Sequence, residues 1–152
     1  MRLWHKDLIT VLPSMQLKGQ WRECCLIAKA LHYGNLNHIL VNRVKDYPID
    51  EFYHYSGLVA EEMTKIASVN DMKVLQYSPN LDCTTDYYLG FAHGYNIFKG
   101  WHNDRYLRQC IYNLEEKAIC GGIPADEWQR IYDVYGKRFD LWNEKEVDKQ
   151  WN

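Results

Sequence analysis

The residues best suited to chemistry lie near the start of the chain, where Met1 and Arg2 precede the stretch Gln20-Trp21-Arg22-Glu23. A chain that begins at Met1 carries a primary α-amine, and such amines have reference pKa values of about 7.7–8.0. About a tenth of that amine is an uncharged nucleophile at neutral pH without special burial. The amine and the Glu23 carboxylate are the two groups that Schiff-base chemistry requires, so Met1 and Glu23 are the candidate catalytic pair.

A predicted helix from about Ser14 must position Glu23. Its apolar stripe recurs at three- and four-residue steps and consists of Leu17, Trp21, Cys24, Ala28 and Leu31. At about 100° per residue, Lys18 and Arg22 fall on one flank of the stripe, whereas Gln16 and Glu23 fall on the other. We therefore expect Glu23 at the boundary between core and solvent.

Three further helices follow from periodicity and from start and stop signals. A second begins at Pro48 and buries Phe52, Val59, Met63 and Ile66. A third begins near Asp104, ends at Gly121-Gly122 and buries Leu107, Cys110, Ile111, Leu114 and Ala118. A fourth opens at Pro124 and carries Trp128, Ile131, Tyr132, Tyr135 and Phe139 at helical spacing. The Tyr-rich stretch from Ser78 to Trp101 is punctuated by glycines and is predicted to be an ordered loop, with room for a short helix. The pattern predicts an all-α fold of about four helices with an irregular middle segment.

Length and composition bound the class of protein. A chain of 152 residues suits one domain over residues 1–152 with one hydrophobic core. No stretch has the length of a membrane span, and the amino terminus lacks a signal-peptide pattern. The five cysteines are an odd number without a CxxC spacing, which favours reduced thiols, most of them in the core. We expect a soluble, cytoplasmic protein that needs no cofactor and no obligate protein partner.

The charge distribution is asymmetric although the net charge is only −2. Residues 1–45 contain seven Lys or Arg and two acidic residues, a balance of +5, so the remainder carries −7. A positive amino-terminal face is suited to phosphates, and binding there would weaken steeply with salt. A chance cluster of solvated lysines is the alternative interpretation.

Both ends of the chain resemble the pyrimidine dimer DNA glycosylases, the phage endonuclease V type of repair enzyme for ultraviolet-damaged DNA. In that family an amino-terminal residue is followed by Arg, and a helix about twenty residues later carries aromatic-Arg-Glu; here these positions are Met1-Arg2 and Trp21-Arg22-Glu23. The stretch Asn113-Leu-Glu-Glu-Lys117, followed by Trp128 and Tyr135-Gly136-Lys137, is similar to the family's carboxy-terminal segment. No counterpart is evident for residues 70–100.

The resemblance implies glycosylase and abasic-site lyase activity on ultraviolet pyrimidine dimers in double-stranded DNA, in the cytoplasm and at the nucleoid. The Met1 amine would attack the anomeric carbon, the base would leave, and β-elimination from the imine would break the strand without a metal. Glu23 would be the acid–base and electrostatic partner. Residues assigned to DNA contact on this basis are Arg2, Gln16, Lys18, Arg22, Trp128, Tyr132, Tyr135 and Lys137. The three aromatic residues of this set also have the spacing of core positions.

Two other functions are compatible with the sequence. A metal site would draw on His5, Cys24, Cys25, His93 and His102, although no two of these have the close spacing of a typical zinc ligand pair. A non-catalytic module on the same helices would bind nucleic acid, a nucleotide or a protein through the Tyr- and Trp-rich middle segment. The second alternative predicts no covalent adduct with DNA.

Overall fold

The chain folds into helices throughout the part that the structure, a computed structural model, describes: residues 2–34, 37–66 and 97–143. Within these ranges there are six helices and no strands. They are η1 (Lys6–Val11, a 3₁₀ helix), α1 (Ser14–His32), α2 (Ile39–Lys45), α3 (Ile49–Ile66), α6 (Asp104–Ile119) and α7 (Ala125–Phe139). The predicted all-α class is confirmed, and α1, α3, α6 and α7 are the four predicted helices.

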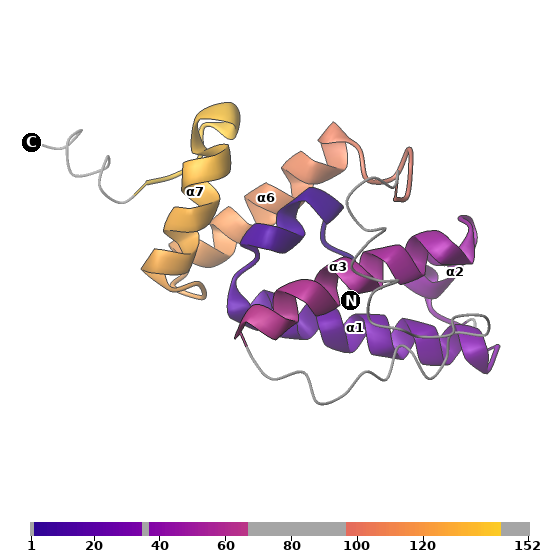
Figure 1. Ribbon diagram of the computed structural model, residues 1–152. Helices are drawn as coiled ribbons and strands as arrows, with labels where there is room; N and C mark the ends of the chain where they lie inside the picture. Colours follow the sequence, from indigo (N-terminus) through magenta and orange to yellow (C-terminus); the bar gives the residue numbers. More distant parts are fainter. Residues whose placement is uncertain (1, 35–36, 67–96, 144–152) are drawn as a thin grey trace, which may run out of the picture.

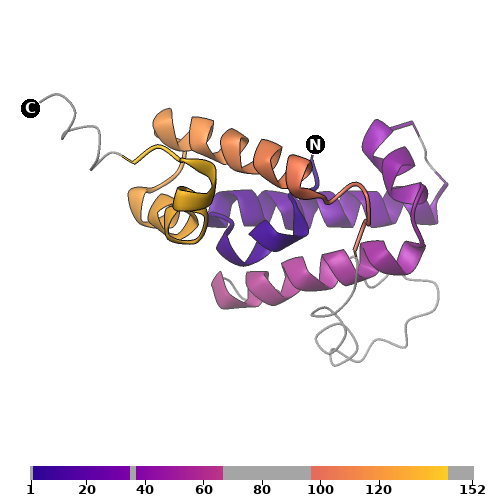
Figure 2. The same cartoon turned by 90° about the horizontal axis from the view of Figure 1, so that it is seen from above.

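The helices pack around an antiparallel pair formed by α1 and α3 (Figure 1). α6 lies on the opposite side of α1 from α3, and α7 packs across the end of this group (Figure 2). The short η1 contacts both α3 and α7, so the start of the chain lies inside the helical assembly. This arrangement surrounds the first residues of the chain with three long helices.

The predicted apolar stripes largely face the core. In α1, Leu17, Trp21, Cys24 and Ala28 are buried, as are all five predicted positions of α6. In α3, Phe52, Val59 and Met63 are buried, but Ile66 is 40% exposed, so its predicted burial was wrong. Ile66 is the last residue of α3, and the buried stripe therefore ends one turn before the helix does.

The elements η1 and α2 were not predicted because they are too short to show a helical period. Each begins with a histidine whose ring replaces the usual capping side chain. His5 Nδ1 accepts a hydrogen bond from the Asp7 N–H at 3.2 Å, and His38 Nδ1 accepts one from the Leu40 N–H at 3.1 Å. Histidine is not among the common N-cap residues, so the sequence carries no strong start signal at either site.

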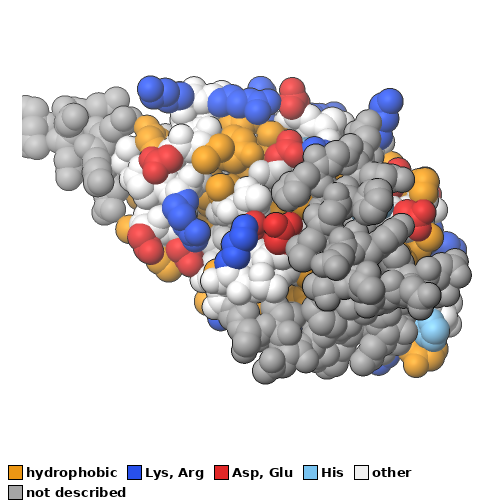
Figure 3. Space-filling view, viewed as in Figure 1, with side chains coloured by type: hydrophobic (Ala, Val, Ile, Leu, Met, Phe, Trp, Pro, Cys, Tyr) orange, Lys and Arg blue, Asp and Glu red, His pale blue; other side chains and the backbone are white. Residues whose placement is uncertain are grey.

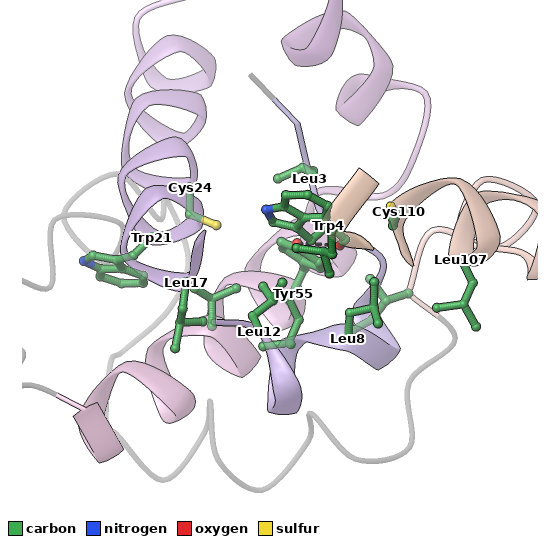
Figure 4. Close-up of a cluster of buried hydrophobic side chains, with 14 of the residues drawn as sticks. Leu3, Trp4, Leu8, Leu12, Leu17, Trp21, Cys24, Tyr55, Leu107 and Cys110 are labelled. Atoms are coloured by element: carbon green, nitrogen blue, oxygen red, sulfur yellow. Dashed lines mark hydrogen bonds between the residues drawn. The ribbon is translucent and has the colours of Figure 1, made fainter. Parts of the chain in front are cut away.

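The buried centre contains the amino-terminal residues Leu3 and Trp4. Figure 4 shows both among Leu8 of η1, Cys24 of α1 and Tyr55 of α3. Leu3, Leu8, Cys24 and Tyr55 have no exposed surface, and Trp4 is 8% exposed. The start of the chain is therefore core structure.

Most of the predicted Tyr-rich loop lies outside the described residues. Its described end, residues 97–103, forms a turn into α6. Phe98 in this turn is fully buried with φ 54°, a left-handed conformation that is rare for a non-glycine residue. Its N–H donates to Glu51 Oε2 at 2.6 Å, which ties the turn to the first turn of α3.

Candidate active site

The amino-terminal segment, Arg2–His5, is held at the meeting point of α1, α3 and α6. The Trp4 N–H donates to Gln20 Oε1 of α1 at 2.8 Å, and the Trp4 carbonyl accepts from Tyr55 Oη of α3 at 2.7 Å. The Leu3 carbonyl accepts from Tyr106 Oη of α6 at 2.5 Å. Side chains from three helices thus fix the backbone of the two residues that follow Arg2.

An open pocket of about 380 Å³ lies beside this segment. Eight residues line this amino-terminal pocket: Arg2, Trp4, Gln16, Gly19, Gln20, Glu23, Asn113 and Lys117. They come from the start of the chain, from α1 and from the last turns of α6. The fold therefore brings together the predicted residues Arg2, Gln16 and Glu23, which the sequence separates by up to twenty-one positions.

Three side chains of the pocket carry buried polar atoms with no hydrogen-bond partner among the described residues: Gln16 Oε1, Gln20 Nε2 and Glu23 Oε2. Buried polar groups in folded proteins are usually paired, because leaving one unpaired costs free energy. One carboxylate oxygen, one amide oxygen and one amide NH2 group beside this pocket thus have hydrogen-bonding capacity that no described residue uses. Glu23 itself is half-buried, which confirms its predicted place at the edge of the core.

The pocket also contains two cationic side chains. Arg2 is exposed, and its guanidinium carbon lies 5.3 Å from the ring centroid of Trp4. Lys117 is exposed in the last turn of α6, where a positive charge is favourable to the helix dipole. Among the described residues that line the pocket, Glu23 is the one carboxylate, so their charges sum to +1, which suits an anionic ligand.

The predicted DNA-contact residues Lys18 and Arg22 are exposed on α1 but do not line this pocket. At about 100° per residue they lie on a different face of α1 from the pocket residues Gln16, Gly19 and Glu23. The structure therefore does not bring Lys18 and Arg22 together with the other predicted residues.

The aromatic residues of α7 have structural roles instead of forming an exposed surface. Trp128 is 6% exposed and its Nε1 donates to the Trp142 carbonyl at 3.1 Å, while Tyr135 is 8% exposed and its Oη donates to the Asp7 carbonyl at 2.9 Å. Tyr132 is half-buried, and its ring packs against Gly136 so closely that a Cβ added to Gly136 would lie 2.8 Å from ring carbons of Tyr132. This burial favours the core interpretation over a stacking platform for bases. Only Lys137 of the predicted α7 set is exposed.

Met1 lies outside the described residues, as do His93 and Cys83. Among the described residues, no group of three or more His, Cys, Asp or Glu side chains is placed to hold a metal ion. His5 and His102 of the predicted ligand set stack with ring centroids 5.1 Å apart, and Cys24 lies in the core. Burial raises the pKa of the Cys24 thiol to about 12, which keeps it protonated and a poor nucleophile.

Comparison with known proteins identifies the amino-terminal part of the chain. Residues 1–74 match the family model of pyrimidine dimer DNA glycosylase. Over these residues, just under half of the chain, the protein is similar to that family. Searches of curated proteins and of solved structures found no match. Within the described residues no helix is long and apolar enough to cross a membrane.

Five pocket residues were not among the predicted site residues: Trp4, Gly19, Gln20, Asn113 and Lys117. Asn113 and Lys117 lie outside the matched range, yet they begin and end the stretch that resembles the family's carboxy-terminal segment. They are four residues apart, so they share one face of α6. The four-residue spacing of Asn113 and Lys117 indicates from the sequence that they share a helix face. It could not show that this face lines the same pocket as Arg2 and Glu23.

Proposed function

We propose that this protein is a DNA glycosylase for ultraviolet pyrimidine dimers that also cleaves the resulting abasic site, with the Met1 α-amine as nucleophile. The match to the family model over residues 1–74 supports dimer glycosylase function in general. The observation that carries the finer proposal is the pocket that Arg2, the neighbour of Met1, lines together with Glu23, whose Oε2 has no hydrogen-bond partner among the described residues. Because consecutive Cα atoms are about 3.8 Å apart, an amine one residue before Arg2 is within reach of this pocket.

The reaction begins with attack of the uncharged amine on C1′ of the damaged nucleotide. The N–C1′ bond forms, and the glycosidic bond breaks with its electron pair leaving on the base, which then takes up a proton. The amine nitrogen loses a proton, the C1′–O4′ bond breaks to give the iminium, and O4′ is protonated. Removal of a C2′ proton then places a double bond at C2′–C3′ and expels the 3′ phosphate.

Glu23 is suited to both tasks that this reaction requires of a carboxylate, which are to accept a proton and to stabilise positive charge. Its unpartnered oxygen can accept the proton from the amine or from C2′, and its charge stabilises the iminium and oxocarbenium-like species. Gln16 Oε1 and Gln20 Nε2 offer an acceptor and a donor to the sugar or to the extruded nucleotide. Because no metal or cofactor supplies charge in this scheme, the side chains of the pocket do so.

The cations around the pocket bind the DNA backbone on either side of the lesion. Arg2 and Lys117 line the pocket, and Lys18 and Arg22 are exposed on a neighbouring face of α1. Contacts of this kind fix the position of the duplex without reading its sequence, as a lesion-directed enzyme requires. We do not include Trp128 and Tyr135 among the contact residues, because their rings are buried.

Borohydride trapping tests the proposal. The full chain is incubated with duplexes that contain a thymine dimer, an abasic site or no lesion, and sodium borohydride reduces any imine to a stable adduct. We expect adducts with both lesions and none with the intact duplex. An amino-terminally blocked form should give no adduct, and Glu23→Gln should reduce trapping by about 10²-fold or more, the range for loss of a general acid–base group.

Glu116→Gln is the matched control, since Glu116 is an exposed residue of α6 outside the pocket. It should trap at the wild-type rate. An adduct that persists after the terminus is blocked would reject Met1 as the nucleophile. No adduct on either lesion, with salt-dependent binding intact, would favour the non-catalytic binding module instead.

A further inference from the structure

The backbone around the amino-terminal segment is held by side chains from five parts of the fold. In addition to the contacts of Leu3 and Trp4, the Lys6 N–H donates to His102 Nδ1 at 3.0 Å and the Asp7 carbonyl accepts from Tyr135 Oη at 2.9 Å. The first residues of a chain are usually poorly ordered unless they are tied down. Three of these contacts are hydrogen bonds from tyrosine hydroxyls: Tyr106 donates to the carbonyl of Leu3, Tyr55 to that of Trp4 and Tyr135 to that of Asp7.

The hydroxyls of the two tyrosines nearest the terminus remain protonated and can therefore donate hydrogen bonds. Tyr55 has no exposed surface and Tyr106 is half-buried, and burial raises the pKa of both hydroxyls. Cys110 raises the pKa of Tyr106 further, while the nearby Arg2 guanidinium opposes this effect. Both hydroxyls therefore stay protonated over the pH range in which the amine becomes a nucleophile.

Gln20 links these ties to the pocket. Because the Trp4 N–H requires an acceptor, it fixes Oε1 of the Gln20 amide toward the backbone, and Nε2 is then the atom left unpartnered in the pocket. Gln20 is 1% exposed, so this orientation is held by packing as well. The same side chain thus contacts the amino-terminal segment and lines the pocket beside Glu23.

We propose that Tyr106 and Tyr55 are positioning residues that direct the amino-terminal amine to the reacting sugar through the carbonyls of Leu3 and Trp4. The inference rests on the proposed function, and neither tyrosine lines the pocket. Attack on C1′ needs the nitrogen at near-attack distance, and a misplacement of about 1 Å can cost about 10²-fold in rate. Tyr106 acts closest to the terminus, since its acceptor is only two residues after Met1.

Tyrosine-to-phenylalanine variants test this proposal, because each removes one hydroxyl and retains the ring. Tyr106→Phe and Tyr55→Phe are compared with Tyr135→Phe, whose acceptor, Asp7, lies within η1 and farther from the terminus. Three quantities are measured: Tm, affinity for a duplex with an uncleavable tetrahydrofuran site, and single-turnover borohydride trapping on an abasic duplex. Amide order parameters of Arg2, Leu3 and Trp4 provide a readout independent of activity.

We expect all three variants to lower Tm and to retain the affinity for the tetrahydrofuran duplex. Trapping at saturating DNA should fall about 10- to 100-fold for Tyr106→Phe, less for Tyr55→Phe, and not at all for Tyr135→Phe. The fall should be the same at every pH from about 6 to 9, because the hydroxyls position the amine and exchange no proton with it. The order parameters should decrease at Arg2 and Leu3 only in the first two variants.

Equal trapping by all three variants and wild type would overturn the positioning role, as would order parameters that do not change in Tyr106→Phe. A shift in the pH dependence of trapping would also overturn it, because it would indicate direct acid–base participation. Failure of the proposed function is distinguishable, since wild type itself would then give no adduct on any lesion.

Discussion

His102 shows how one buried side chain can make the stability of the whole fold depend on pH. Its ring is 7% exposed, stacks on His5 and accepts the Lys6 N–H at Nδ1, so it must be neutral in the folded protein. Burial, together with smaller effects of the nearby His5 and Lys6, lowers its pKa to about 2. Burial lowers the pKa of His5 as well, and this effect is larger than the opposing effect of the Asp7 charge. Protonation of either histidine is therefore unfavourable in the folded protein.

The free energy of unfolding should therefore fall as the pH drops below 6.5, the ordinary pKa of His102 in the unfolded chain. There the unfolded chain binds a proton that the folded protein does not, at about 1.4 kcal/mol per pH unit for each such histidine. His102→Asn retains an acceptor for the Lys6 N–H. It should reduce the slope of the free energy of unfolding against pH by the contribution of one proton, about 1.4 kcal/mol per pH unit. Urea unfolding at a series of pH values measures it.

His38→Asn is the matched control, because His38 is exposed and accepts the Leu40 N–H in the same manner. It should leave the slope unchanged. A slope that is equally steep in His102→Asn would assign the pH dependence to other groups.

At the scale of secondary structure, a side chain of α7 caps the first turn of α1. Pro13 at the N-cap offers no side-chain cap, and instead Glu127 of α7 accepts from the Ser14 N–H at 3.2 Å and from Ser14 Oγ at 2.6 Å. The carboxylate also meets the positive end of the α1 dipole. Because α1 carries Gln16, Gln20 and Glu23, this contact helps to fix the helix that supplies half of the pocket.

Glu127→Ala should lower the free energy of unfolding by about 1–2 kcal/mol, the usual cost of losing an N-cap. Glu127→Gln should lower it by about 0.5–1 kcal/mol, since an acceptor remains and the charge is lost. Chemical denaturation of both variants beside Glu116→Gln provides the measurement. An effect of Glu116→Gln as large as that of Glu127→Gln would show that the net charge, not the cap, is responsible.

At the scale of the whole molecule, the weak net charge conceals a local surface suited to DNA. On the face in Figure 3, basic and acidic side chains are interspersed over the described part. The amino-terminal pocket differs, because Arg2 and Lys117 line it, and Lys18 and Arg22 are exposed on the same helix, α1, that supplies Glu23. Binding should therefore depend on these few cations and not on the net charge of −2.

Lys117→Gln should reduce the slope of log K against log salt by about 0.9 if Lys117 neutralises one phosphate. Fluorescence anisotropy with a tetrahydrofuran-containing duplex at several salt concentrations measures the slope. Lys137→Gln should leave the slope unchanged, because Lys137 does not line the pocket. An equal reduction in both variants would extend the DNA interface to α7.

The sequence by itself determined the four long helices and the position of Glu23 on one of them. Hydrophobic period and start signals locate α1, α3, α6 and α7, because a long amphipathic helix is specified by its own residues. The same period placed Glu23 at the edge of the core, and the family motifs at Arg2 and Glu23 lie within the matched residues 1–74.

Only the tertiary structure decided which residues meet. Asn113 and Lys117 reach Arg2 across more than a hundred residues of sequence, and Tyr106 and Tyr55 hold the segment after Met1 by hydrogen bonds to its carbonyls. The period likewise left open whether Trp128 and Tyr135 face DNA or the core, and packing against Trp142 and Asp7 buried them. Periodicity reports which face of a helix is apolar, whereas contacts between distant segments depend on how the helices pack against one another.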